Sequence, residues 1–123
     1  MPWSVNSLAC DAVTYILQNS SRSDGFIRET REFLAREREA IATRFKDSPH
    51  IHWFPSCTSF MLGRLKGPHT AAGVCSALAD RQILIRNCSN FNGLSEDYIR
   101  VSLKNSDANQ RFSDILSDLL EVT

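Results

Sequence analysis

The strictest pattern in this sequence is an alternation of apolar and polar residues between positions 98 and 104. The apolar members are Ile99, Val101 and Leu103, and Arg100 is among the polar residues between them. Successive side chains of a strand point to opposite faces of a sheet, so this pattern predicts a strand with one buried face and one open face. A sheet built on such a strand needs a covering layer on one side only.

Seven further segments have the pattern of short strands or helices. The expected strands cover residues 51–54, 58–65 and 83–86. The expected helices cover residues 3–19, 24–46, 70–80 and 107–121, with a polar break at 19–25 between the first two. This order predicts an α+β fold: a small, largely antiparallel sheet of about four strands with helices packed on one face. The continuous apolar run Ile83–Ile85 predicts that its strand is central in the sheet.

Length and charge narrow the class of protein. A chain of 123 residues predicts a single domain spanning 1–123. Fourteen Lys and Arg residues balance fourteen Asp and Glu residues, which argues against a nucleic-acid partner because that function needs a basic face. The N-terminus has no signal-peptide pattern, and no apolar run reaches the roughly 20 residues of a membrane span. We therefore expect a cytoplasmic protein with no membrane partner.

The histidines and cysteines do not predict a metal site or a nucleophile. His50 and His52 form an H-x-H pair near Cys57, but a zinc site usually needs three or four ligands. A Cys–His nucleophile pair would need a third orienting group, and none stands out in the sequence. The four cysteines include no C-x-x-C pair, so we expect reduced thiols rather than a disulfide framework.

Two arginines are the strongest candidates for a binding site. Arg86 ends the run Ile83–Ile85, and Arg100 lies on the polar side of the next strand. If these strands form a hairpin across the loop 87–97, both guanidinium groups lie near one end of the sheet. They would then be able to hold two anionic groups of one ligand. The alternative, which the pattern leaves open, is that each arginine pairs with a carboxylate of this domain or of a neighbour.

Several motifs resemble those of a known family. These are Met-Pro-Trp-Ser-Val-Asn at 1–6, Ile-Leu-Ile-Arg-Asn-Cys-Ser-Asn-Phe-Asn-Gly-Leu at 83–94, Tyr-Ile-Arg-Val at 98–101 and Asn-Gln-Arg at 109–111. Together they resemble the small domain of fold-type I pyridoxal-phosphate enzymes. The branch is that of histidinol-phosphate aminotransferase and threonine-phosphate decarboxylase of cobalamin biosynthesis. The opening motif, the 83–94 stretch and the 14-residue step between the arginines look closer to the decarboxylase.

The resemblance implies a function and a role for each arginine. Arg100 matches the family arginine that grips the substrate α-carboxylate, and Arg86 matches the one that contacts the substrate phosphate. The implied function is substrate binding in a pyridoxal 5'-phosphate-dependent L-threonine-O-3-phosphate decarboxylase, with O-phosphothreonine as substrate. The alternatives are a histidinol-phosphate or related aminotransferase and a stand-alone anion-binding module. Asn6 matches a position near the active-site entrance and has no defined role.

The family's cofactor lysine has no counterpart in this chain. The three lysines, Lys46, Lys66 and Lys104, do not stand in the family's Ser-Lys context. The resemblance places the cofactor lysine upstream, so we expect this chain to be the C-terminal small domain of a longer, homodimeric enzyme whose large cofactor domain is absent. We accordingly expect no catalytic residue, no bound cofactor and no activity in the isolated chain. Trp3 and the first helix are expected to belong to a former interface of the parent enzyme that the isolated chain exposes.

Overall fold

The computed structural model describes residues 6–122. Trp3 and most of the opening motif therefore lie outside the described residues. The pattern of contacts divides the chain into two compact units, Met1–Phe33 and Leu34–Thr123, which we describe separately. The expectation that 1–123 is a single domain stays a prediction.

The first unit contains helix α1 (Ser7–Gln18) and the beginning of helix α2 (Ser20–Arg44). Asn6 caps α1, because its side-chain oxygen accepts a hydrogen bond of 2.8 Å from the backbone N–H of Ala9. The expected helix 3–19 is thus confirmed where the structure describes it.

The expected break at 19–25 is wrong. Only Asn19 separates the two helices, and α2 already begins at Ser20. The backbone N–H of Asn19 donates to the carbonyl groups of Tyr15 and Ile16, and the Ser23 hydroxyl lies within hydrogen-bond distance of the carbonyl oxygens of Asn19 and Ile16. The Asn19 side-chain amide also donates to the carbonyl of Tyr15 at 2.9 Å. The Ser23 and Asn19 side chains therefore bond back to the helix backbone, where the sequence pattern had predicted a loop.

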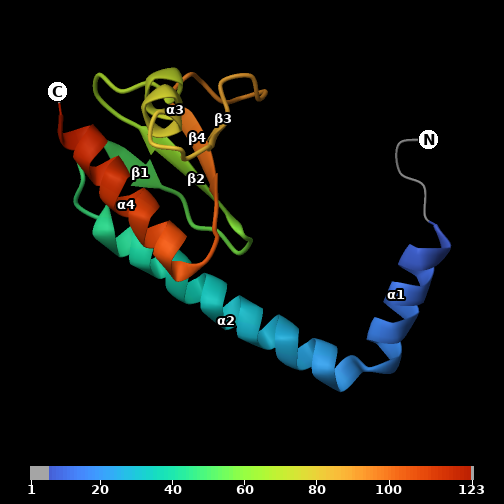
Figure 1. Ribbon diagram of the computed structural model, residues 1–123. Coiled ribbons are helices and arrows are strands. Elements are labelled where there is room, and N and C mark those ends of the chain that lie inside the picture. Colours follow the sequence, from blue (N-terminus) through green and yellow to red (C-terminus); the bar gives the residue numbers. More distant parts are fainter. Residues whose placement is uncertain (1–5, 123) are drawn as a thin grey trace. The chain divides into compact units, whose positions relative to one another are not determined.

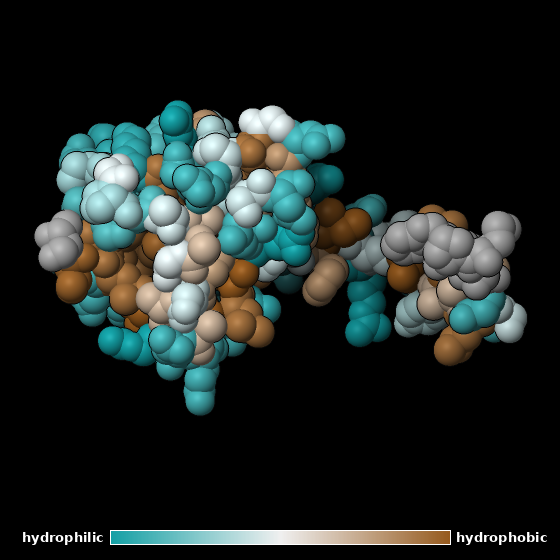
Figure 2. All heavy atoms as spheres, turned by 90° about the horizontal axis from the view of Figure 1, so that it is seen from above, coloured by the Kyte–Doolittle hydropathy of each residue, from teal (hydrophilic) through white to brown (hydrophobic). Residues whose placement is uncertain are grey.

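Apolar residues that recur at steps of three and four form a stripe along α1 and the beginning of α2, and this stripe is not buried. None of the residues of α1 is buried. The strongly exposed apolar side chains of this unit include Leu8, Val13, Ile16, Leu17, Phe26 and Ile27. Figure 2 shows such apolar atoms at the surface of the molecule among polar ones. The periodicity of this stripe correctly predicted helices, although burial of the stripe does not follow from it.

The second unit is built on one antiparallel sheet (Figure 1). Its four strands, in the spatial order β1-β2-β4-β3, are β1 (Ile51–Trp53), β2 (Phe60–Leu65), β4 (Tyr98–Ser102) and β3 (Arg86–Asn87). Every neighbouring pair is antiparallel. With the four helices of the described residues, this confirms the predicted α+β class.

The strand expected at 83–86 is shorter and differently placed. Only Arg86 and Asn87 pair with the sheet, and β3 is an edge strand rather than a central one. The chain turns at Gln82, whose φ of 63° is left-handed, and the N–H of Ile83 bonds to the carbonyl of Leu78. Ile83 and Ile85 pack against the core while Leu84 is exposed. The apolar run therefore reflects packing beside the sheet, not a strand buried on both faces.

One hydrophobic core joins the sheet to the helices of the second unit. Helices α3 (Ala71–Ala79) and α4 (Ser106–Glu121) and the end of α2 supply one side of it. The strands supply their alternate residues, of which the buried apolar ones are Ile51, Trp53, Met61, Leu65, Ile99 and Val101. The other face of the sheet carries the residues between these, and they are exposed or half-buried; we call it the open face.

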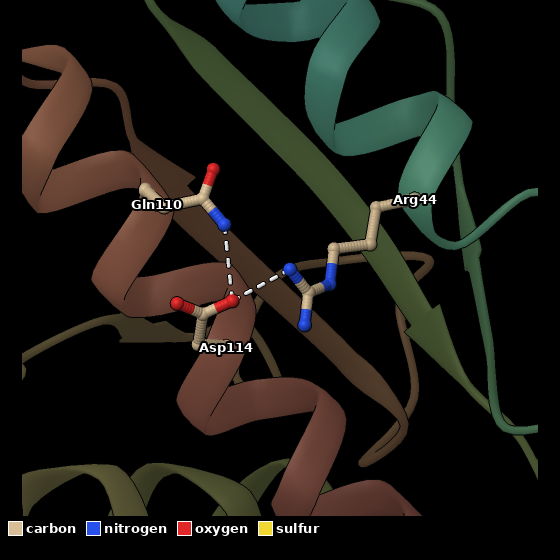
Figure 3. A network of polar contacts seen from close by, with 3 residues as sticks. All are labelled: Arg44, Gln110 and Asp114. Atoms are coloured by element: carbon tan, nitrogen blue, oxygen red, sulfur yellow. Dashed lines mark hydrogen bonds and ion pairs between the residues drawn. The ribbon is translucent and has the colours of Figure 1, made fainter.

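Polar contacts hold α4 in place. The Nη1 atom of Arg44 lies 2.6 Å from Oδ1 of Asp114, which also accepts a hydrogen bond of 3.0 Å from Gln110 (Figure 3). The buried Asn109 side chain binds both backbone groups of Lys104, accepting from its N–H at 2.8 Å and donating to its C=O at 2.9 Å. These bonds tie the start of α4 to the end of β4.

Candidate anion-binding site

The two arginines predicted to form a site lie side by side on the open face of the sheet. Arg86 of β3 stands directly opposite Arg100 of β4, at a separation that puts such Cα atoms about 5 Å apart. Arg86 is exposed and Arg100 is half-buried, whereas Ile99 and Val101 beside it are buried. The predicted hairpin and the predicted outward direction of Arg100 are therefore confirmed.

An aromatic ring lies under each guanidinium group. The Cζ atom of Arg100 lies 4.4 Å from the ring centre of Phe60, and that of Arg86 lies 5.3 Å from the ring centre of Phe91. Arg86 also donates a hydrogen bond of 3.2 Å to Oδ1 of Asn90. Contacts of this kind restrict a flexible side chain and leave its N–H groups free for a ligand.

Neither arginine has a carboxylate partner among the described residues. The salt bridge found in this part of the chain joins Arg44 to Asp114, so no described carboxylate oxygen lies within 4.0 Å of Arg86 or Arg100. The described part of this domain therefore does not supply the carboxylates that the alternative interpretation required. Two adjacent unpaired cations repel each other and favour an anion between them.

The two arginines also affect the ionisation of a nearby thiol, that of Cys88. Cys88 is buried and follows Arg86 by two residues. Burial raises the pKa of the Cys88 thiol above its ordinary value, while the guanidinium groups of Arg100 and Arg86 lower it in part. Both cations are thus close enough to favour a negative charge at the position of this sulfur atom.

The sequence reasoning missed a third arginine on the same face. Arg64 of β2 is exposed, pairs in register with Tyr98 of β4 and lies 5.8 Å from the centre of its ring. Arg100 is two residues from Tyr98, so Arg64 and Arg100 are diagonal neighbours. The buried residues Met61, Gly63 and Leu65 alternate with residues that are exposed or half-buried. The sequence Phe-Met-Leu-Gly-Arg-Leu does not alternate in polarity, so it gave no signal that would have placed Arg64 on the open face.

The other candidate residues do not come together. His52 is exposed on β1, Cys57 is exposed in the following loop, and half-buried His50 faces His69 at 5.2 Å between ring centres. Among residues 6–122, no group of three or more His, Cys, Asp or Glu side chains is arranged to hold a metal ion.

Within the same residues, no helix combines the length and the apolar character needed to span a membrane.

The lysines of this chain do not fit a pyridoxal-phosphate site. Lys46, Lys66 and Lys104 are all exposed, and they follow α2, β2 and β4 respectively. A lysine that forms a Schiff base is usually desolvated or placed beside another cation, which lowers its pKa. The described lysines therefore offer no such setting for the cofactor's aldehyde.

Comparison with known proteins gives a consistent result. No protein-family model matches the chain. The histidinol-phosphate aminotransferase of Methanosphaera stadtmanae is 34% identical over 97 residues, which are 78% of this chain and 26% of that protein. The enzyme of the same name from Methanoculleus marisnigri is 30% identical over 118 residues, which are 96% of this chain and 31% of that protein.

A solved structure matches nearly the whole chain. L-threonine-O-3-phosphate decarboxylase from Porphyromonas gingivalis superposes with a TM-score of 0.74 at 33% identity, covering 97% of this chain and 35% of that one. The fold of this chain thus corresponds to about a third of that larger enzyme chain. Over the part that it shares with these relatives, the chain is similar to fold-type I pyridoxal-phosphate enzymes, among them these aminotransferases and this decarboxylase. It spans about a third or less of the curated relatives it matches.

The comparisons test the expected function only in part. They confirm the resemblance to pyridoxal-phosphate aminotransferases and decarboxylases. They do not single out the threonine-phosphate decarboxylase, because the curated relatives reported above are named histidinol-phosphate aminotransferases. The roles expected for Arg86 and Arg100 stay predictions.

Proposed function

We propose that Arg86 and Arg100 bind the anionic groups of the substrates of a pyridoxal-phosphate-dependent histidinol-phosphate aminotransferase. The observation that carries this proposal is the direct pairing of the two arginines on an open sheet face, with no described carboxylate within 4.0 Å. The names of the curated relatives support this enzyme over others of the family.

The two arginines have different tasks in this proposal. Arg86 is exposed at the edge of the sheet and binds the phosphate of histidinol phosphate. Arg100 is half-buried over Phe60 and binds the carboxylate of the amino-acid partner, 2-oxoglutarate or glutamate. A guanidinium group forms paired hydrogen bonds with either anion, which sets the orientation of the substrate as well as its affinity.

The cofactor belongs to the part of the relatives that this chain does not span. Pyridoxal phosphate, when bound there, acts as an electron sink for the bond that breaks at the α-carbon. The residues described here contribute binding and orientation, because none of the three lysines lies in a buried setting. On this proposal the isolated chain has no activity of its own.

A second candidate is an L-threonine-O-3-phosphate decarboxylase. The observation that favours it is the match with the Porphyromonas gingivalis enzyme, at 33% identity over 97% of this chain. O-phosphothreonine carries a carboxylate and a phosphate in one small molecule, and neighbouring arginines suit such a substrate.

The test compares two reactions in the longest natural protein that contains this chain. One assay measures keto-acid formation from histidinol phosphate and 2-oxoglutarate, and the other measures carbon dioxide release from O-phosphothreonine. Turnover in the first supports the aminotransferase, and turnover in the second alone transfers the proposal to the decarboxylase. Turnover in neither refutes both.

A variant of Arg100 tests the site itself. Arg100→Ala should lower kcat/KM roughly 30- to 1,000-fold, because it leaves a substrate carboxylate without its partner. This fall corresponds to a loss of about 2–4 kcal/mol of transition-state stabilisation. Arg31→Ala is the matched control, since Arg31 is exposed on α2 in the other unit. Near-normal turnover of the Arg100 variant would remove this residue from the site.

A further inference from the structure

The open face of the sheet carries a second group of side chains suited to an anion. We define the Arg64 cluster as His52, Phe54, Arg64 and Tyr98, which come from β1, the residue after β1, β2 and β4. His52 stands opposite Arg64, and Arg64 stands opposite Tyr98. The three residues therefore form one row across three adjacent strands, separate from the row of Arg86 and Arg100.

A chain of ring contacts runs through this cluster. The His52 and Phe54 rings meet edge to face at 4.8 Å between centres, Phe54 stacks on Tyr98 at 6.2 Å with an angle of 16°, and Arg64 lies over Tyr98 at 5.8 Å. These distances are typical of aromatic and cation–π contacts. The contacts hold an imidazole, a guanidinium and a phenol on one face of the sheet.

The guanidinium group of Arg64 has no polar partner among residues 6–122. No described side chain or carbonyl accepts a hydrogen bond from it, and no described carboxylate oxygen lies within 4.0 Å. The bonds that arginines make elsewhere in the unit show what such a partner would be: Arg38 donates to the carbonyl of Thr58 and Arg111 to that of Arg81. The Arg64 cluster thus presents donors without a protein acceptor.

We propose that the Arg64 cluster is a binding site for a phosphoryl group, distinct from the Arg86 and Arg100 pair. A phosphate offers three or four acceptor oxygens, enough for the fork of Arg64 together with the Tyr98 hydroxyl and a ring N–H of His52. A carboxylate has only two oxygens and satisfies fewer of these donors. The phosphoryl group comes either from free phosphate or from an organic phosphate monoester, whose organic part would meet the Phe54 and Tyr98 rings.

The test is an NMR titration of the 123-residue chain with inorganic phosphate, with sodium chloride at equal ionic strength as the reference. The backbone amides of His52, Arg64 and Tyr98 should shift saturably, with a midpoint in the millimolar range. Shifts at these amides that are linear, or equal to those in chloride, would overturn the proposal. Tyr98 lies two residues from Arg100, so the amides of His52 and Arg64 assign binding to the cluster, and the amides of Arg86 and Asn87 follow the other pair.

Variants separate the two sites and guard against unfolding. Arg64→Gln should weaken the response of the cluster about tenfold and change any response at Arg86 and Arg100 much less. Arg64→Lys keeps the charge but loses the forked guanidinium group, so its affinity for phosphate should lie between those of the native chain and Arg64→Gln. Arg31→Gln removes one charge from the other unit and should change nothing. Equal binding by Arg64→Gln and the native chain, with native-like spectra in both, would refute the site.

The source of the phosphoryl group follows from a second ligand. Phenyl phosphate that binds several-fold tighter than inorganic phosphate at the cluster supports the site and assigns it to an organic monoester. Equal affinity supports the site and assigns it to free phosphate. Binding of neither compound at these amides would overturn the proposal.

Discussion

Replacement of Gly63 by alanine tests how the sheet packs beneath its helices. Gly63 is buried on β2, directly opposite Trp53 of β1. A methyl group at this position would lie 2.9 Å from Cε3 and Cζ3 of Trp53 and 3.2 Å from Cδ1 of Ile51. Carbon atoms pack best at about 3.5–4.0 Å, so the indole ring would have to move. Phe45 and Phe112, at 6.5 and 6.2 Å between ring centres, restrict that movement.

The magnitude follows from two opposing effects. Forcing an extra methyl group into a packed core costs about 1–3 kcal/mol. Alanine also reduces the conformational freedom of the unfolded chain, which returns about 0.5–1 kcal/mol. Gly63→Ala should therefore destabilise the fold by about 1–2 kcal/mol. In urea unfolding followed by far-ultraviolet circular dichroism, this loss lowers the midpoint by about 1 M.

Two further variants decide whether the reasoning is right. Gly25→Ala is the control, because no atom lies within 4 Å of the added group, and in helix α2 it should be neutral or stabilising by up to about 1 kcal/mol. In a Trp53→Leu background, Gly63→Ala should lose most of its cost, since the clash is with the indole ring. A Gly63→Ala protein as stable as the native chain, or an unchanged cost without Trp53, would refute the account.

Two other predictions concern a buried amide and the thiols. Asn109→Ala should destabilise the fold by about 1–3 kcal/mol in the same assay, because it removes both hydrogen bonds to the Lys104 backbone. The control Asn92→Ala, in an exposed loop, should destabilise it by less than about 0.5 kcal/mol. Equal effects of the two substitutions would contradict the role of Asn109. Burial raises the pKa of Cys75 and Cys88, so the folded state holds these protons longer than the unfolded state. The protonated thiols therefore contribute fully to the free energy of unfolding below the ordinary thiol pKa of about 8.5. This contribution is lost as the pH rises through their higher pKa in the folded state. Cys88→Ala should flatten the fall in urea midpoint between about pH 8 and pH 10, and a native chain with no such fall would contradict the prediction.

The alternation of apolar and polar residues predicted some features of the candidate site but not others. Alternation at 98–104 correctly placed Ile99 and Val101 inward and Arg100 outward, because the period of two is local to the strand. The sequence also predicted the hairpin that brings Arg86 beside Arg100, but it did not predict the other partner of Arg100. Phe60 contacts Arg100 through the pairing of β2 with β4, which are far apart in the sequence, and such pairing is set by register and by the packing of the whole sheet.

The run Ile83–Ile85 shows where the same reasoning failed. Three consecutive apolar residues predicted a central strand, but the left-handed turn at Gln82 and the bond from Ile83 to the carbonyl of Leu78 keep this segment outside the sheet. Apolar side chains lower the free energy by leaving water, and a core offers that gain to a loop beside the sheet as well as to a strand within it.

The sequence by itself determined the local elements of this protein: four helices and four strands in their order, the inward face of β4, and the resemblance to fold-type I pyridoxal-phosphate enzymes. Those features depend on residues near each other in the chain, where periodicity and capping act. The tertiary structure decided which strand lies at the edge, and it placed Arg86 opposite Arg100 and Arg64 over Tyr98. These placements bring distant residues together, and only the closing of the shared core sets the register that does so.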